Sequence, residues 1–226
     1  MTFNKSSLLA VGSAIALLGL GGQAQAADLD GRSLARVKAQ AQVAIDARLS
    51  SLKTSLALVS TGSPSLVPAD RSELSGLLST DITGLTALGQ RIQADTALAT
   101  ARIDAADILS EYRVYALAEP QVHRVRATDS IRLVVLPALT DAQSALVKAF
   151  QAAGKPAPPQ MADLAANIQA ISTSTSGLSS TLLGFTPAQW NANHELLAPT
   201  RQTLQTVRAD IRAARADVVA ARELLT

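Results

Sequence analysis

Apolar residues recur in steps of three and four along most of the chain, and this spacing limits the folds open to it more than any other feature. The first such series is Leu34, Val37, Ala41, Ile45, Leu49, Leu52, Leu56 and Val59. Because an α-helix has about 3.6 residues per turn, side chains at this spacing form one apolar stripe. Alanine, the strongest helix former, fills 43 of the 226 positions, whereas aromatic residues, which favour strands, make up 3%. The sequence therefore predicts an all-α protein.

Five stripes of this kind follow one another, separated by prolines, glycines and polar turn residues. They cover residues 34–59, 74–109, 122–150, 164–185 and 190–225. Each predicts a helix of about 25 to 50 residues, and a helix of about 33 residues is about 50 Å long. We expect an elongated antiparallel bundle of about five long amphipathic helices with coiled-coil-like packing. One strand-like alternative stays open at the β-branched pair Val134-Val135, although it lacks alternating flanks and turn residues.

Residues between the first two stripes predict where these helices end and begin. Thr61-Gly62-Ser63-Pro64 ends the first helix, which starts near residue 30. Asp70-Arg71-Ser72-Glu73 has the pattern of a capping box at the start of the second helix. Gly76, Gly84 and Gly89 weaken the first half of that helix, and they also admit the close approach of another chain segment.

Prolines divide the middle of the chain. Pro120 has no glycine or polar loop around it, so we expect either a sharp kink or a very tight break there. Pro137 marks a second kink. Residues 154–159, Gly-Lys-Pro-Ala-Pro-Pro, form the clearest linker and a candidate hinge between two halves of the bundle.

The last quarter of the chain contains further helix signals. The Ser/Thr tract over residues 172–181 is expected to be the polar side of a helix, because apolar residues continue at helical spacing through it. Gly184 suits the residue that follows a helix, and Thr186-Pro187 suits the start of the next one. Trp190, near that start, is expected to anchor the core.

The first 26 residues have the layout of a secretory signal peptide. Lys5 gives a positive start, residues 8–20 are apolar, and Ala24-Gln25-Ala26 offers the small residues that signal peptidase requires. The apolar stretch is too short to span a bilayer comfortably, so an uncleaved anchor is the weaker alternative. We expect cleavage after Ala26 and a secreted or extracytoplasmic mature chain over residues 27–226, without a transmembrane segment.

Charge and cysteine content narrow the chemistry further. The chain has no cysteine, which excludes disulfides and thiolate metal sites. Basic residues exceed acidic ones over 28–60 and 121–155, whereas acidic residues dominate 70–119. Helices of opposite sign should therefore attract at their exposed edges. An alternative is a basic face for polyanions such as cell-wall polymers, and the lack of an aromatic-studded basic groove argues against nucleic acid.

Motifs for catalysis, metals and cofactors are scarce. His123 and His194 lie far apart in the sequence, and no nucleophile elbow, phosphate-binding glycine loop or calcium-loop spacing occurs. Asp104, Asp107 and Glu111 form a carboxylate row on one helix, which is interpreted as a solvated acidic face. The sequence therefore indicates no catalytic residue, no metal ligand set and no cofactor.

The densest polar cluster lies around Pro120. If the helix is only kinked there, one stripe carries Tyr112, Tyr115, Glu119, His123 and Arg126. These side chains are our candidate ligand-binding residues, with Arg126 holding an anion and the tyrosines walling the pocket. The alternative is a polar network that satisfies the backbone groups freed by the proline.

The same region carries a resemblance to a group of proteins. The segments Tyr112-Arg113-Val114-Tyr115, Pro120-Gln121-Val122-His123 and Arg126-Ala127-Thr128-Asp129, with the Arg/Ala/Asp/Val-rich helix over 208–224, are similar to those of exported Ala/Arg-rich α-helical proteins of high-GC Gram-positive bacteria. Those proteins are generally uncharacterised, so the resemblance implies export and helices and no particular activity.

These observations favour an exported, non-enzymatic helical protein that acts as an interaction or scaffold module of the cell envelope. Its partner would be an envelope protein or a cell-wall polymer. The main alternative is an extracytoplasmic helical bundle that binds a small ligand, either an anion or a metal ion. An enzyme and a lipid-surface protein are less favoured, and the sequence leaves the oligomeric state open.

The apolar stripes make one prediction about stability. Replacing Ile211, in the middle of the last stripe, by aspartate should lower the free energy of unfolding by several kcal/mol, because an unpaired charge would be buried. Thermal unfolding measured by circular dichroism checks this. An unchanged transition would show that the stripe does not face a core.

Overall fold

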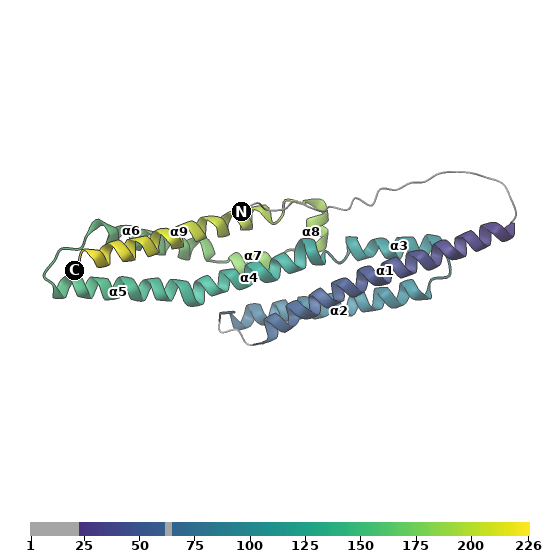
Figure 1. Cartoon of the computed structure of the whole chain (residues 1–226), viewed down its shortest axis with the longest axis horizontal. Helices are drawn as coiled ribbons and strands as arrows, with labels where there is room; N and C mark the ends of the chain where they lie inside the picture. The colour runs from purple at the N-terminus through teal and green to yellow at the C-terminus, as the bar shows by residue number, and fades with distance from the viewer. Residues whose placement is uncertain (1–22, 62–64) are drawn as a thin grey trace.

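The computed structural model describes residues 23–61 and 65–226, with side chains from residue 31 onward. In this part the protein is helical throughout and contains no strand (Figure 1). The elements in chain order are α1 Gln23–Ser60, α2 Pro68–Ala94, α3 Leu98–Ser110, the π-helical turn η1 Val114–Ala118, α4 Glu119–Ser130, the π-helical turn η2 Ile131–Val135, α5 Leu136–Ala152, α6 Pro159–Thr175, α7 Leu178–Leu183, α8 Pro187–Ala192 and α9 Ala198–Glu223. The expected all-α fold is confirmed, whereas residues 1–22 of the predicted leader lie outside the described residues.

The helices form two three-helix bundles placed along one long axis. Figure 1 shows α1, α2 and α3 packed together at one end, and α5, α6 and α9 at the other. Between them, α4 packs against α7, and α7 also touches α2. The molecule is elongated, as expected. However, its two ends are separate groups of helices, because several of the predicted long helices are broken.

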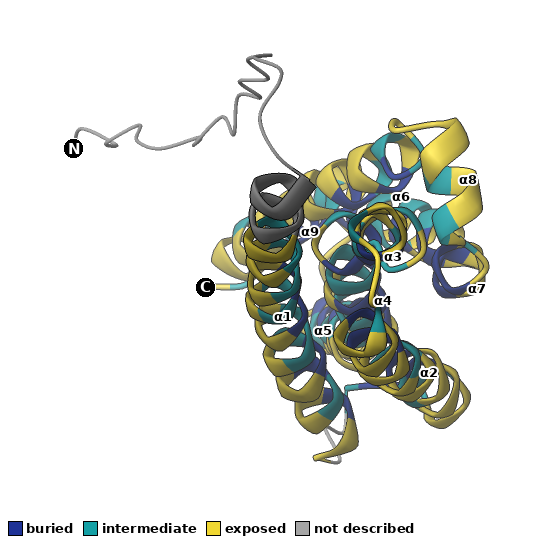
Figure 2. Cartoon of the chain, turned by 90° about the vertical axis from the view of Figure 1, so that its right-hand side faces the viewer, coloured by how far each residue is buried: buried dark blue, intermediate teal, exposed yellow. Residues whose placement is uncertain are grey.

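Burial follows the predicted apolar stripes. Viewed along the axis in Figure 2, the helix faces that meet are buried and the outward faces are exposed. In α1, Ala41, Ile45, Leu52 and Val59 are buried. The buried residues of α9 include Leu204, Val207, Ile211, Ala214 and Val218. These positions confirm that the three-and-four spacing marks the core face of each helix.

The second predicted helix is broken near its middle. The chain turns at residues 95–97, where Asp95 adopts an extended conformation with φ −57° and ψ 134°. The Asp95 backbone N–H donates to the Arg91 and Ile92 carbonyls and so closes the end of α2, whereas its side-chain Oδ2 is buried without a hydrogen-bond partner in the described part of the chain. The apolar stripe continues across the turn because α2 and α3 both pack on α1, so periodicity alone could not reveal the break.

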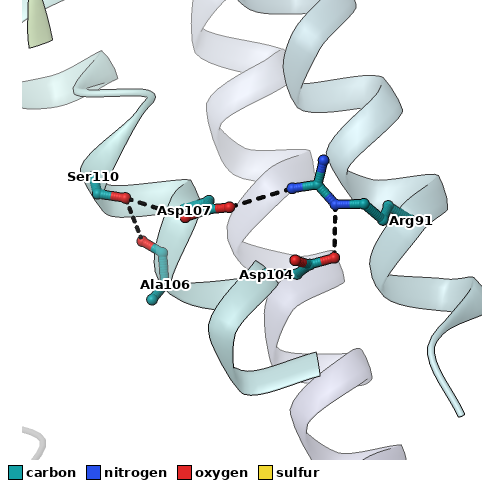
Figure 3. A network of polar contacts seen from close by, with 5 residues as sticks. All are labelled: Arg91, Asp104, Ala106, Asp107 and Ser110. Atoms are coloured by element: carbon teal, nitrogen blue, oxygen red, sulfur yellow. Dashed lines mark hydrogen bonds and ion pairs between the residues drawn. The ribbon is translucent and has the colours of Figure 1, made fainter. Parts of the chain in front are cut away.

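The carboxylate row was expected to be a solvated acidic face, but two of its three carboxylates are paired with an arginine. Arg91 Nε donates to Asp104 Oδ2 at 2.6 Å, and Arg91 Nη2 donates to Asp107 Oδ2 at 3.2 Å (Figure 3). Asp104 is 9% exposed, whereas Glu111 is exposed. Arg91 thus bridges two carboxylates and links α2 to α3 across the turn, so two of the three carboxylates are engaged.

The predicted capping box at Asp70 is wrong. The N-cap of α2 lies three residues earlier, at Val67, so the helix begins at Pro68, and no side-chain cap bond is present. Proline is well suited to the first position of a helix, because its fixed φ is helical and its missing N–H needs no partner there. Asp70 therefore lies within the first turn, where its negative charge interacts favourably with the positive end of the helix dipole.

Neither Pro120 nor Pro137 breaks the chain, because each follows a π-helical turn. The Glu119 N–H donates to Val114 O, and the Leu136 N–H donates to Ile131 O, so both turns have the wide hydrogen-bond pattern of a π-helix. A proline ring clashes with the carbonyl four residues earlier, and a widened turn gives that carbonyl room. Helical structure thus runs from residue 114 to residue 152.

The Ser/Thr tract is helical as predicted, apart from one break. Gly177, with φ +71°, separates α6 from α7 in the left-handed conformation that suits glycine. Gly184 ends α7 with φ −74°, so it does not adopt the expected left-handed form. The predicted start at Thr186 is confirmed by a capping box with Gln189.

Residues 153–158 connect α5 to α6 where the linker was predicted, and Pro159 already belongs to α6. The two helices pack side by side, and Lys155 Nζ donates to Leu224 O at 2.9 Å. The last predicted helix is divided into α8 and α9, because the segment over 193–197 turns the chain and α9 begins at Ala198, with Pro199 in its first turn.

Two glycines of α2 provide a matched test of packing. A Cβ at Gly84 would lie 2.8 Å from Tyr112 Cε1, whereas a Cβ at Gly76 would meet nothing within 4 Å. Gly76→Ala should therefore raise the free energy of unfolding by about 0.5–1 kcal/mol through helix propensity. Gly84→Ala should lose that gain, because Tyr112 must move away. Equal stabilisation of both variants in urea denaturation would contradict the close approach.

Candidate functional site

The five residues of the predicted polar stripe do not gather into one site. Tyr112 precedes η1 and lies against Gly84, and Tyr115 is 49% exposed beneath the Arg48 guanidinium, 5.2 Å from the ring centroid. His123 is exposed, whereas Glu119 and Arg126 are partly buried. Across residues 23–61 and 65–226, no side-chain hydrogen bond, ion pair or ring contact joins any two of the five.

The reason is a change of helical register. The stripe requires one regular helix through residues 112–126, but residues 111–113 are not helical and η1 is wider than an α-helix. The backbone near Pro120 is accommodated by the π-helical turn, so the predicted side-chain network is not needed there. The role of these five residues as ligand contacts stays a prediction, without support from their geometry.

Trp190 lies at the junction of the two ends of the molecule. It packs, partly buried, against the core, as expected. The Arg113 guanidinium stands 4.7 Å from the centre of its ring, and the His194 ring centroid is 4.3 Å away. Arg113 Nε also donates to Asn191 Oδ1 at 2.6 Å. Arg113 thereby holds α8 against the segment that precedes η1.

A cavity of about 60 Å³ lies beside this contact, and we call it the junction pocket. It is formed where α2, the η1–α4 segment and the α7–α8 connection meet. Most of its wall is apolar. The lining residues are Leu74, Leu77, Leu78, Asp81, Arg113, Leu117, Ala118, Gln121, Val122, Phe185 and Pro187.

Two of the three polar side chains in the junction pocket are already engaged. Gln121 Nε2 donates to Leu182 O at 2.7 Å and to Phe185 O at 2.9 Å, and Arg113 is held by Asn191 and Trp190. Asp81 differs from both, because it makes no hydrogen bond or ion pair within the described part of the chain. It is the one charged group of the pocket without a protein partner there.

Burial raises the pKa of Asp81 from 3.8 to about 6. The cause is loss of hydration in a mostly aliphatic surrounding, which disfavours the charged carboxylate. A perturbed carboxylate in a concave site is a recognised mark of a binding or catalytic position. Asp81 and the junction pocket therefore form the candidate small-ligand site.

Sequence analysis missed Asp81, although a signal for it exists. Asp81 follows Leu77 by four residues and precedes Leu85 by four, so it occupies a position of the apolar stripe itself. A carboxylate on the core face of an amphipathic helix is unusual and calls for a partner or a function. Arg113 and Phe185 could not be assigned to the same site, because only the packing of α7 and α8 brings them there.

A second candidate surface lies between α5 and α9, and we call it the α5–α9 groove. Its volume is about 440 Å³, and its lining is aliphatic except for one arginine. Val134 is 50% exposed and Val219 54% exposed, so its edges lie open to solvent. The lining residues are Val134, Val135, Ala138, Leu139, Ala142, Arg215, Val218 and Val219.

The part of the chain that contains η2 and α5 is also apolar over a long stretch. By length and composition, the stretch Leu98–Ala152, which is helical apart from residues 111–113, could cross a membrane. The core helix of a soluble protein passes the same test when it is mostly buried. In this stretch, however, Leu133, Val134 and Val147 are exposed to solvent.

No family model, curated protein or solved structure matches the chain. Within the residues that the structure describes, no group of three or more His, Asp or Glu side chains is placed to hold a metal ion. The candidate sites therefore rest on this chain's own residues, and the resemblance to exported Ala/Arg-rich proteins stays a prediction.

The raised pKa of Asp81 makes stability depend on pH. Because the folded pKa lies above the unfolded value, this carboxyl group destabilises the fold increasingly as pH rises from about 4 through about 6. Asp81→Asn should raise the free energy of unfolding at pH 7.5 by about 1 kcal/mol, after allowance for solvent screening of a half-buried group. The gain should shrink as the pH falls towards 4.

Urea denaturation at several pH values measures this effect. Asp141→Asn, on an exposed position of α5, serves as the control and should change stability by less than about 0.5 kcal/mol at every pH. A gain for Asp81→Asn that does not vary with pH would show that ionised Asp81 is not strained by burial.

Proposed function

We propose that the protein is an exported, non-enzymatic helical module of the cell envelope, and that it binds another envelope protein through the α5–α9 groove. The observation that carries this proposal is the groove itself, an aliphatic channel of about 440 Å³ with open edges. Exposed apolar surface of this kind is typical of places where proteins associate.

The shape of the groove suits a helix as its partner. Ala138 and Ala142 are small, so a partner backbone can come close to α5, while Val134 and Val219 stand at the edges. Amphipathic helices bind in such channels by inserting aliphatic side chains at helical spacing. A partner helix would be a fourth helix beside α5, α6 and α9, and it would cover apolar surface that the bundle leaves exposed.

The chemistry of the lining favours a protein over a cell-wall polymer. Polysaccharides and polyanions need hydrogen-bonding groups, aromatic platforms or clustered positive charge. The groove offers one arginine, Arg215, and otherwise aliphatic carbon. Aliphatic side chains also supply no nucleophile or proton donor, so the groove supports binding and not catalysis. The predicted signal peptide supports a location outside the cytoplasm.

A second candidate function is the binding of a small ligand in the junction pocket. The specific observation in its favour is Asp81, a partly buried carboxylate without a protein partner in the described chain and with a pKa raised to about 6. The two functions use different surfaces, so one can hold without the other.

Site-specific photo-cross-linking in the producing cell tests the groove. A photoreactive residue in place of Val134 should give cross-links to another protein several-fold more often than one in place of Val43. Val43 is the matched control, since it is 70% exposed on α1, in the other bundle. The variant Val219→Glu should suppress the cross-link from position 134, because the new charge would be buried in the complex.

Each other outcome counts against the proposal. Cross-links from position 134 to a second copy of this chain would replace the envelope partner by self-association. Cross-links to polysaccharide alone would favour a cell-wall polymer. Equal cross-linking from positions 134 and 43 would show that the groove has no specific occupant.

A further inference from the structure

We infer that the junction pocket binds a small primary ammonium group, with the Asp81 carboxylate as its counter-ion and the surrounding leucines around its alkyl part. This inference deepens the second candidate function and rests on it, since it presupposes that the pocket takes a ligand at all.

The charges of the pocket select a cation. Arg113 and Asp81 are the charged groups in its wall. Arg113 keeps its charge, but its guanidinium bonds to Asn191 Oδ1 and lies over the Trp190 ring, and no ion pair joins it to Asp81 within the described residues. Asp81 has no such partner among the described residues. A carboxylate accepts hydrogen bonds from an ammonium group and repels an anion, so an incoming cation gains an interaction that no protein group supplies.

The other lining residues of the pocket do not suit a metal ion or a quaternary ammonium ion. A hard metal ion requires several oxygen ligands, and the pocket offers a single carboxylate among leucines. A quaternary ammonium ion is recognised mainly by a cage of aromatic rings, whereas Phe185 is the one aromatic residue in the lining. A primary ammonium group needs only a strong acceptor for its N–H donors, and Asp81 provides one.

The size of the pocket limits the ligand to a slender molecule. Its volume of about 60 Å³ is well below the roughly 300–1,000 Å³ of pockets that hold drug-sized ligands. An ammonium group with its first methylenes fits, and the rest of a linear chain would extend towards the opening. Leu74, Leu77 and Leu78 would cover the methylenes and exclude water from the ion pair, which strengthens it.

Binding should depend on the protonation of Asp81. The titratable or charged side chains close to it are Arg113, in the pocket wall, and Tyr112, whose pKa is raised by burial and by the charge of Asp81. The lining residues from α4 and from the α7–α8 connection carry no titratable group. Because burial raises the pKa of Asp81 to about 6, an ammonium ligand should bind above that pH and be released below it.

A matched set of probes tests the inference on the full mature chain. n-Butylammonium, 1-butanol and butyrate have similar size and differ in charge. In an NMR titration at pH 7.5, n-butylammonium should shift backbone signals of the α2 and α4 residues that line the pocket, saturably. 1-Butanol should bind about tenfold more weakly or worse, and butyrate should give no saturable shift.

Two variants and a lower pH test whether the ionised Asp81 carboxylate is what binds the ammonium group. Asp81→Asn should lower the affinity for n-butylammonium about tenfold while leaving that for 1-butanol unchanged, and the folded state is not at risk because this variant is expected to be more stable. Asp141→Asn should bind like the parent chain. At pH 5 the parent should resemble Asp81→Asn.

The alternative results separate the two levels of the argument. Equal binding of n-butylammonium and 1-butanol would overturn ammonium selectivity and retain a pocket for small ligands. Preference for butyrate would assign the pocket to Arg113 and anions. No saturable binding of any probe up to about 0.1 M would remove both the ammonium inference and the small-ligand function.

Discussion

The arrangement of the middle of the molecule depends on one buried carboxylate, Asp129 of α4. Its Oδ2 accepts the Val67 N–H at 2.9 Å, and its Oδ1 accepts the Ser179 hydroxyl at 2.9 Å. Burial raises the pKa of Asp129, and these two hydrogen bonds lower it part of the way back. A buried carboxylate is costly unless its oxygens are satisfied, so α4 can pack here only with the start of α2 and with α7 in place. Eight residues earlier, Gln121 bonds to the carbonyls at the end of α7. These two side chains fix three elements that wall the junction pocket.

The sequence predicted the fold class and most core positions because helical periodicity depends only on which residues are apolar. It did not predict the turn at residues 95–97, since α2 and α3 both present their stripes to α1 and the spacing runs on across the turn. It also misjudged Asp104 and Asp107, because Arg91, their partner, lies on the preceding helix. The geometry of the turns decides which helices come into contact, and the spacing of apolar residues does not predict that geometry.

The candidate site shows the same limit more sharply. The expected stripe from Tyr112 to Arg126 assumed regular helical geometry through Pro120, and the π-helical turn removes that geometry. Asp81, by contrast, lies on a regular helix and was detectable as a charge on the apolar stripe. The residues that complete the pocket opposite Asp81 could not be predicted from the sequence. Phe185 and Pro187 reach it only because Asp129 and Gln121 hold α7 on α4.

The two π-helical turns connect the fold to both candidate surfaces. Each precedes a proline by the same interval, with Val114 and Ile131 as first residues and Pro120 and Pro137 beyond. A π-helical turn adds a residue to one turn and so rotates the side chains that follow relative to a regular helix. Leu117 and Ala118 of η1 line the junction pocket, and Val134 and Val135 of η2 line the α5–α9 groove. In both places the turn that accommodates a proline also turns apolar side chains towards a cavity. The prolines thus shape the helix that carries both surfaces without interrupting it.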